Sequence, residues 1–253
     1  MIGTAQTPGP GGAFPGTRSA LMQSKTIHGI ELVAPSSCAQ SCFHTAAHVV
    51  RTDEYQIGPI VRAKHTVAHV IDVGANIGIF GACVRRHWPL CKVLAWEPVA
   101  EVAECCRLNV PGAEVRVAAA WSADGELRID ILPELTIGSS IHESWRSGDW
   151  FTEQRTVRAE RVSTRIPQDW PFDIDILKID CEGSEVRILD ELRASGTLQR
   201  IRWIRGEWHG KPNKDACRQV FESAGTHVYK FDAGDGRVGP FIAHRGQRTG
   251  CCH

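Results

Sequence analysis

Four short polar clusters in this sequence carry the side chains that could do chemistry. The first is an aspartate followed by a glycine-rich turn, Asp72-Val73-Gly74-Ala75-Asn76-Ile77-Gly78, and the second is Glu97-Pro98. The third runs from Asp180 to Glu185, and the fourth holds Glu207 and His209. Carboxylates can accept protons and hydroxyl hydrogens, and histidine can carry protons near neutral pH. The clusters therefore indicate a site that binds a polar ligand and moves a proton.

Each cluster follows an apolar segment that we expect to be a β-strand, and helices separate these strands. That alternation is typical of βαβ units, so the predicted fold class is α/β, with a mostly parallel, doubly wound sheet and a C-terminal antiparallel hairpin. Ligands of such sheets bind beyond the carboxyl ends of the strands, where all four clusters fall. The expected strands are 67–73, 93–96, 115–119, 174–179 and 201–204, and the hairpin strands are 228–231 and 241–243.

The turn from Gly74 to Gly78 predicts a site for a nucleoside. Its glycines let a ligand approach the backbone, and we expect free N–H groups to point at that ligand. Glu97 is placed to accept both hydroxyls of a ribose. Asn76 stands where a dinucleotide-binding turn needs glycine, and no phosphate-binding P-loop motif occurs. A cofactor with a positive charge and no phosphate is favoured, and S-adenosylmethionine (SAM) is such a cofactor, with Asp72 facing its methionine end.

Four side chains are candidates for a catalytic base: Asp180, Glu182, Glu207 and His209. Asp180 comes directly after its strand, and His209 is expected to titrate near neutrality. Each also has a structural interpretation, since acids favour a helix start and Glu207 can pair with a nearby arginine. Asp180, Glu207 and His209 could alternatively hold a divalent metal, but no compact ligand motif supports one and no metal is predicted.

Residues 126–163 interrupt the alternation of strands and helices. Two paired strands are expected at its ends, with hydroxyl and aromatic side chains between them. The segment is either a lid or wall that contacts the substrate, or a surface excursion packed by its own tryptophans. On the first interpretation, the candidate substrate-binding residues are Ser139, Ser140, His142 and Trp145.

The rest of the chain divides by composition. Residues 1–25 are rich in glycine and proline and are expected to be a flexible tail, and 246–253 a second tail. Residues 26–66 form an N-terminal extension packed on the core, with an extended piece at 55–61, and 67–245 form the domain that carries all four clusters. The role of the Cys38, Cys42 and His44 cluster stays open, because no second cysteine pair accompanies it.

Composition excludes several classes of protein. The 253 residues contain 29 basic and 29 acidic side chains, without the basic excess of a general nucleic-acid binder. No apolar run of about 18 residues occurs, so no membrane span is expected. The N-terminus lacks the pattern of a signal peptide, and a cytoplasmic protein is expected. The predicted partner is a small molecule, with neither nucleic acid nor membrane involved.

The glycine turn, then Glu97-Pro98, then the sequence Lys-Ile-Asp-Cys-Glu-Gly-Ser-Glu at 178–185, resembles the FkbM family of SAM-dependent methyltransferases. The resemblance covers about residues 26–210. It implies a class I Rossmann-like methyltransferase fold and methylation of hydroxyl or carboxyl oxygens on natural products or sugars. It also implies a set of SAM-binding residues: Asp72, Gly74, Ala75, Asn76, Gly78, Glu97, Pro98, Ala119, Ala120 and Asp180.

One position departs from that family's pattern, because Cys181 replaces the usual valine. Two other functions stay open for the same fold. One is a nicotinamide-dependent oxidoreductase, against which Asn76 argues. The other is a non-catalytic domain that binds SAM.

Overall fold

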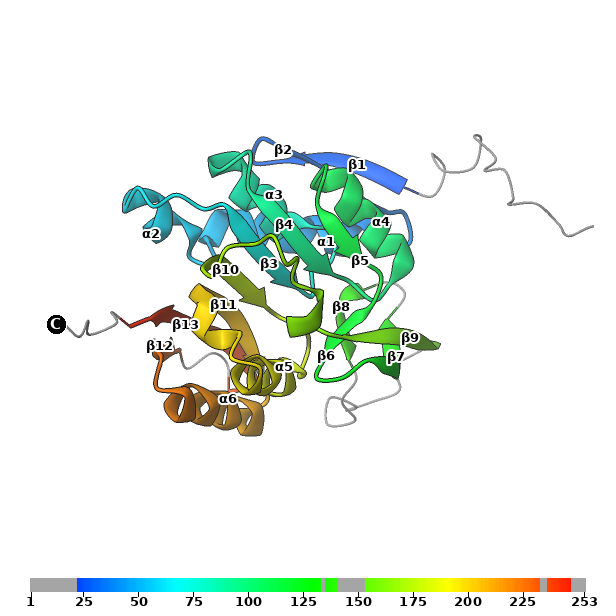
Figure 1. Ribbon diagram of the computed structural model, residues 1–253. Helices are drawn as coiled ribbons and strands as arrows, with labels where there is room; N and C mark the ends of the chain where they lie inside the picture. The colour runs from blue at the N-terminus through cyan, green and yellow to red at the C-terminus, as the bar shows by residue number, and fades with distance from the viewer. Residues whose placement is uncertain (1–21, 133–134, 141–152, 233–235, 247–253) are drawn as a thin grey trace, which may run out of the picture.

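Apolar runs of the sequence form a seven-stranded sheet at the centre of the protein (Figure 1). The structure is a computed structural model, and it describes residues 22–132, 135–140, 153–232 and 236–246. The order of strands across the sheet is β12-β13-β11-β10-β3-β4-β5. These strands are β3 (His69–Val73), β4 (Lys92–Trp96), β5 (Glu114–Arg116), β10 (Ile174–Ile179), β11 (Ile201–His209), β12 (His227–Phe231) and β13 (Val238–Arg245).

The strand order confirms the predicted fold class. Strand β13 is antiparallel to both of its neighbours, and β11, β10, β3, β4 and β5 pair in parallel. The chain goes from β3 outward to β4 and β5, and later from β10 outward to β11 and β13. The direction of winding therefore reverses between β3 and β10. Open α/β sheets bind ligands at such a reversal, beyond the carboxyl ends of the strands.

Helices cover both faces of the sheet (Figure 1). One face carries α1 (Ala39–Thr52), α3 (Ile79–His87) and α4 (Ala100–Asn109), together with a hairpin of β1 (Met22–Ile27) and β2 (Ile30–Pro35). The other face carries α5 (Glu185–Ala194) and α6 (Lys211–Ala224). Because successive residues of a strand point to opposite faces, each central strand contributes to both of the resulting hydrophobic clusters.

The register of the parallel strands decides which polar side chains become neighbours. Lys178 of β10 pairs with Asp72 of β3, so these two side chains lie side by side on the face that α1 and α3 cover. Ile179 pairs with Val73 on one side and with Gly206 on the other. The residues that follow these pairs form a row at the carboxyl edge, and that row holds the site described below.

Three expectations about the elements are wrong in detail. Strand β1 begins at Met22, so residues 22–25 belong to a strand and not to the predicted tail. The extended piece expected at 55–61 contains a helix, α2 (Ile57–Arg62), because the carboxylate of Asp53 accepts the N–H groups of Ile57 and Gly58 at its start. The third strand of the central sheet ends at Arg116, and Ala119–Trp121 forms β6 in another sheet.

That second sheet is the insertion predicted at 126–163. Its strand order is β6-β9-β7-β8, with β7 (Gly125–Leu132), β8 (Leu135–Ser140) and β9 (Glu153–Arg161). The expected pairing of its ends is confirmed, since Leu127 of β7 pairs with Val157 of β9. Ser139 and Ser140 lie on β8. His142 and Trp145 lie outside the described residues, so a substrate wall here stays a prediction.

The Cys38, Cys42 and His44 cluster does not converge on one point. The Cys38 and Cys42 sulfurs lie 3.7 Å apart in the core at the start of α1, whereas His44 is exposed. We therefore assign the two cysteines a packing role.

A single methyl group tests how tightly the sheet packs at Gly206. A Cβ at this position would lie 2.2 Å from the carbonyl oxygen of Ile179 and 2.7 Å from the Phe241 ring. We expect Gly206→Ala to lower the free energy of unfolding by about 2 kcal/mol or more in urea titrations. Gly246→Ala is the matched control, since its nearest atom would be 3.7 Å away. Equal stability of the two variants would contradict this packing.

Candidate active site

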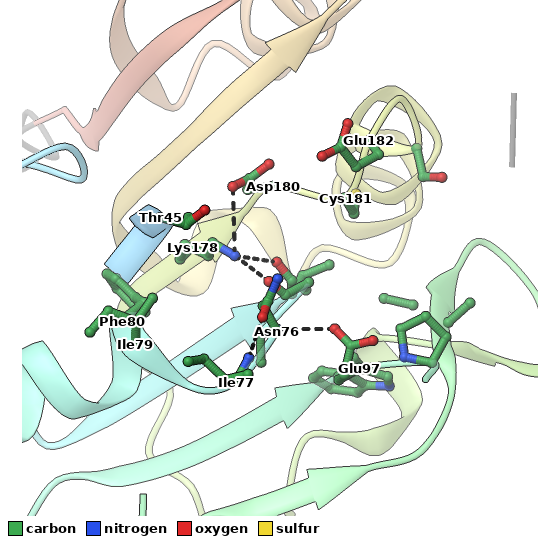
Figure 2. Close-up of a pocket in the computed structure, with 18 of the residues that line it drawn as sticks. Thr45, Asn76, Ile77, Ile79, Phe80, Glu97, Lys178, Asp180, Cys181 and Glu182 are labelled. Carbon is green, nitrogen blue, oxygen red and sulfur yellow. Dashed lines mark hydrogen bonds and ion pairs between the residues drawn. The ribbon is translucent and has the colours of Figure 1, made fainter. Parts of the chain in front are cut away.

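A cavity opens at the carboxyl edge of the sheet, where the direction of winding reverses (Figure 2). Its volume, including its open mouth, is about 1000 Å³. Gly74 of the β3 turn lies at the centre of this edge, with Glu97 after β4 on one side and Asp180 after β10 on the other. Residues that line the cavity include Gly74, Ala75, Asn76, Ile77, Phe80, Glu97, Pro98, Ala119, Ala120, Lys178, Asp180 and Glu182.

The glycine turn packs directly against the end of β10. Gly74 has a φ of +71°, and a Cβ there would lie 1.9 Å from the carbonyl oxygen of Asp180. Glycine is therefore required at this position, both for its backbone conformation and for this close approach. Asn76 adopts a left-handed φ of +51°, which asparagine tolerates better than most residues. The first and third polar clusters of the sequence are thus one packed unit.

The expectation of free N–H groups in this turn is wrong. Gly74 and Ala75 both donate to the carbonyl of Trp96, at 3.1 and 2.9 Å. Asn76 donates to a carboxylate oxygen of Glu97 at 3.0 Å. The last two donors also bond within the protein, Ile77 to the Asn76 side chain and Gly78 to the Ala75 carbonyl. A turn whose N–H groups are all used cannot cradle a phosphate, which argues against a dinucleotide cofactor.

Glu97 braces the turn and also lines the cavity. Its Oε2 accepts the N–H of Asn76, and its Oε1 accepts the N–H of Val99 at 2.9 Å. Each carboxylate oxygen has a second lone pair, so ribose hydroxyls can still bind here. Burial raises the pKa of Glu97 to about 7, against the opposing effect of these two N–H donors. The two N–H donors thus hold the Glu97 carboxylate in place before any ligand binds.

Lys178 is the buried cation beneath the cavity. Its ammonium donates to the carbonyls of Val73, at 3.1 Å, and of Gly74, and it lies 3.9 Å from the Asp180 carboxylate (Figure 2). The Asp72 carboxylate lies 3.5 Å from the same ammonium. Burial opposes its charge, but the carboxylates of Asp72 and Asp180 outweigh burial and raise the pKa of Lys178. The charged ammonium therefore ties the glycine turn to the end of β10.

Two predicted cofactor residues do not lie in the cavity lining. Asp72 is 1% exposed and faces Lys178, so it holds the turn together beneath the cavity instead of facing a ligand. Gly78 packs on Cys106 of α4 and on Val110 just after that helix, where a Cβ would come within 3.0 Å of both side chains. The other predicted cofactor residues line the cavity: Gly74, Ala75, Asn76, Glu97, Pro98, Ala119, Ala120 and Asp180.

Carboxylates gather at the end of the cavity away from Glu97 (Figure 2). Asp180 and Glu182 line this end of the cavity. Glu207 and His209 do not line it, and they lie next to Asp180 on the side away from the cavity. The Nε2 of His209 is 3.4 Å from Glu182, 3.7 Å from Asp180 and 4.0 Å from Glu207. The structure thus brings all four predicted catalytic residues together, but it places two of them on the cavity wall.

His209 is held by the carboxylate of Glu185, the last residue of the third polar cluster. Its Nδ1 lies 2.9 Å from Oε1 of Glu185, which is fully buried and also accepts the N–H groups of Cys181 and Gly183. Burial works against a charge on His209, but the bond to Glu185 and the charges of Asp180 and Glu182 raise the pKa of His209 to about 10. His209 is therefore a cation at neutral pH, and the expected titration near neutrality is wrong.

A divalent cation has potential ligands at the same place. One ligand atom each from Asp180, Glu182 and His209 lie within 4.8 Å of one another. This set differs from the one considered from the sequence, because Glu182 replaces Glu207. Carboxylate and imidazole groups can bind several divalent metals.

Sequence reasoning missed three residues of the site: Lys178, Glu54 and Tyr55. Lys178 had a signal, since it stands within an apolar strand, and a buried lysine needs a partner. Tyr55 donates to Oδ2 of Asp180 at 2.7 Å, and Glu54 hydrogen-bonds Glu207. No local pattern in the sequence indicates that these two residues reach the carboxyl edge.

The family model for the methyltransferase FkbM domain matches residues 72–238. The chain belongs to the FkbM methyltransferase family. The cofactor of this family, SAM, is therefore the cofactor of this protein. No helix in the described part of this FkbM chain is long and apolar enough to cross a membrane.

The FkbM chain is similar to several known methyltransferases. Methyltransferase sdnD of Sordaria araneosa is 26% identical over 151 residues, which are 47% of this chain and 58% of that protein. This chain thus covers little more than half of that relative. The N-terminal domain of human METTL16 in complex with SAH is 11% identical, with a TM-score of 0.46 over 87% of this chain and 88% of that one. Precorrin-6y C5,15-methyltransferase from Geobacter metallireducens is 11% identical, with a TM-score of 0.44 over 79% and 87%.

The cavity of this FkbM domain fits SAM on three counts. Its glycine turn offers no free N–H group to bind a phosphate, and SAM contains no phosphate. Glu97 presents lone pairs for ribose hydroxyls, beside the apolar side chains of Ala119 and Ala120 that can cover an adenine. The carboxylates of Asp180 and Glu182 lie on the cavity wall, where they favour a cationic group.

Loss of the Glu97 charge should weaken the binding of SAM. In Glu97→Gln an NH2 group replaces one carboxylate oxygen, and this group donates hydrogen bonds but cannot accept the backbone N–H or a ribose hydroxyl. We expect the Kd for SAM, measured by titration calorimetry, to rise about 10- to 100-fold. Glu101→Gln, on the first turn of α4, should leave the Kd unchanged. A Kd for Glu97→Gln that equals the wild-type value would remove Glu97 from the SAM site.

The site should make the protein less stable as the pH rises. Burial, reinforced by the charges of Asp180 and Glu54, raises the pKa of Glu207 to about 9, and the pKa values of Glu97 and His209 are raised as well. A group with a raised folded-state pKa stabilises the fold fully below its unfolded pKa, and that stability is lost as the pH rises through the folded value. We therefore expect the free energy of unfolding to fall between about pH 5.5 and 8.5.

Urea titrations at several pH values measure this slope. Glu207→Gln should flatten it, whereas Glu126→Gln, on an exposed part of β7, should not. Stability that is constant or increasing over this range would contradict the raised pKa values.

Proposed function

We propose that this protein transfers a methyl group from SAM to a hydroxyl group of a small molecule. The bound cofactor supplies an electrophilic methyl group on a positively charged sulfur. The residues of the chain hold the two reactants in line and accept the proton that the acceptor loses. Alignment alone can contribute up to about 7–11 kcal/mol, and a positioned base adds about 10²- to 10⁴-fold in rate.

The observation that carries this proposal is the charge of the cavity wall at Asp180 and Glu182. Among the described residues, the two cations next to these carboxylates are Lys178 and His209, and each is already engaged by a buried carboxylate, Asp72 or Glu185. An acceptor that brought its own carboxylate would be repelled here. A hydroxyl acceptor carries no charge and needs a base, which carboxylates provide. Hydroxyl methylation is therefore favoured over carboxyl methylation.

Asp180 is the residue best suited to accept the proton. The pKa of Glu207 is raised to about 9 by burial and by the charges of Asp180 and Glu54, so Glu207 is protonated at neutral pH. His209 is charged at neutral pH for the reasons given above and cannot act as a base there. Asp180 lines the cavity directly, and the ammonium of Lys178 and the imidazolium of His209 lie near its carboxylate. Glu182, which also lines the cavity, is placed to contact the acceptor.

A small molecule is the acceptor class that the charges support. The chain has no basic excess, and carboxylates line the acceptor end of the cavity. Phosphate groups of a nucleic acid would meet these carboxylates unfavourably. The experiment below separates the enzyme from a non-catalytic domain that only binds SAM.

Incubation with methyl-labelled SAM and matched pairs of alcohols and carboxylic acids tests the proposal, with mass spectrometry locating the label. We expect label on hydroxyl oxygens, and Asp180→Asn should slow transfer by about 100-fold or more while the Kd for SAM changes less than about threefold. Asp190→Asn, an exposed residue of α5, is the matched control. Methyl esters as products would contradict hydroxyl specificity, and full activity of Asp180→Asn would contradict its role as base.

A further inference from the structure

We propose that the turn between α1 and α2, residues 53–56, is part of the active site, and that Tyr55 is a positioning residue for Asp180. This turn precedes the segment that the family model matches, residues 72–238. The inference rests on the proposed function, because it assigns Tyr55 a role in the same proton transfer. It extends the site to the face of the sheet that α1 covers.

Hydrogen bonds within the turn and to the start of α2 hold its conformation. Asp53 and Gln56 both adopt left-handed backbone conformations, with φ values of 50° and 49°. The N–H of Gln56 donates to the carbonyl of Asp53 at 2.7 Å. The Asp53 carboxylate caps α2 by accepting the N–H groups of Ile57 and Gly58, at 2.8 and 2.9 Å. Glu54 and Tyr55 are thereby presented together at the carboxyl edge of the sheet.

Tyr55 is packed on three sides. Its ring meets Phe80 edge to face, with centroids 5.4 Å apart, and the ammonium of Lys178 lies 5.5 Å from the ring centroid. Its hydroxyl donates to Oδ2 of Asp180 at 2.7 Å. Burial and the adjacent Asp180 charge raise the pKa of Tyr55 well above its ordinary value. The hydroxyl therefore stays a donor across the range in which enzymes are assayed.

The partners of the Asp180 carboxylate differ between its two oxygens. Oδ2 receives the Tyr55 hydroxyl and lies 3.9 Å from the Lys178 ammonium, whereas Oδ1 lies 3.7 Å from Nε2 of His209. With Oδ2 engaged by Tyr55, Oδ1 is the oxygen left to accept the proton of a hydroxyl acceptor. The Tyr55 donor stabilises the charged carboxylate and fixes its orientation.

The same turn delivers a second group next to Asp180. Glu54 hydrogen-bonds Glu207, and burial together with the charge of Asp180 raises the pKa of Glu54. Two carboxyl groups that share a proton carry one negative charge between them. Among the described residues, the charged or titratable groups near Asp180 include Lys178, His209, Glu182, Tyr55, Asp72, Cys181 and this pair of glutamates.

A spectroscopic experiment tests the contact without any methyl acceptor. The chain has two tyrosines, Tyr55 and Tyr229, so the full chain labelled with ¹³C at the tyrosine ζ carbon gives two signals that Tyr55→Phe and Tyr229→Phe assign. We expect Asp180→Asn to move the Tyr55 signal and to leave that of Tyr229, which bonds Glu222, in place. An unchanged Tyr55 signal would overturn the inference, whether or not the protein transfers methyl groups.

Kinetics on an acceptor identified with labelled SAM test the role. We expect Tyr55→Phe to lower kcat about 10- to 100-fold, with the KM for SAM changed less than about threefold. Tyr229→Phe should match the wild type. A wild-type kcat for Tyr55→Phe would overturn this inference alone, whereas a wild type that transfers no methyl group would refute the proposed function.

Discussion

The site depends on the interactions of the buried Lys178 ammonium with the carboxylates and carbonyl oxygens around it. A buried cation is tolerated only when carboxylates and carbonyl oxygens surround it, and Lys178 has Asp72, Asp180 and two carbonyls of the glycine turn. These partners come from two neighbouring strands, at the point where the winding of the sheet reverses. Satisfying one charge therefore brings together the glycine turn, which we propose faces the cofactor, and the Asp180 carboxylate, which we propose faces the acceptor.

The division of labour among the acidic residues follows from their surroundings. Asp72 and Glu185 are deeply buried and each engages one cation, so they hold the site together without reaching the cavity wall. Glu97 is anchored by two N–H groups and keeps lone pairs for a sugar. Asp180 and Glu182 line the cavity, with Glu207 behind Asp180 kept neutral by burial and by like charges. Side chains of one chemical type thus play three different roles.

Much of this architecture could be predicted from the sequence, because its causes are local. Buried parallel strands are apolar runs, and the polar cluster after each run lies at the carboxyl edge, as Glu97, Asp180 and Glu207 do. Asn76 in the turn argues against a phosphate-bearing cofactor. The structure adds a reason that the sequence could not show, because the N–H groups of Gly74, Ala75 and Asn76 all donate to Trp96 or Glu97 at the end of the next strand.

The features of the site and fold that the sequence did not predict depend on contacts between residues far apart in the chain. Tyr55 meets a residue that is 125 positions away, and no local pattern marks such a partner. The charge state of His209 depends on Glu185, which is bonded to it only because α5 begins beside the end of β11. The break after Arg116, which moves Ala119 into a second sheet, follows from pairing with β9 and not from the propensity of the segment.

The most direct test is a crystal structure of the protein with S-adenosylhomocysteine, the demethylated cofactor. The account predicts that the nucleoside lies between the glycine turn and Ala119, with its ribose on Glu97 and its sulfur toward Asp180, above a Lys178 that keeps its present partners. A nucleoside bound elsewhere, or a Lys178 side chain turned out of the interior, would contradict it.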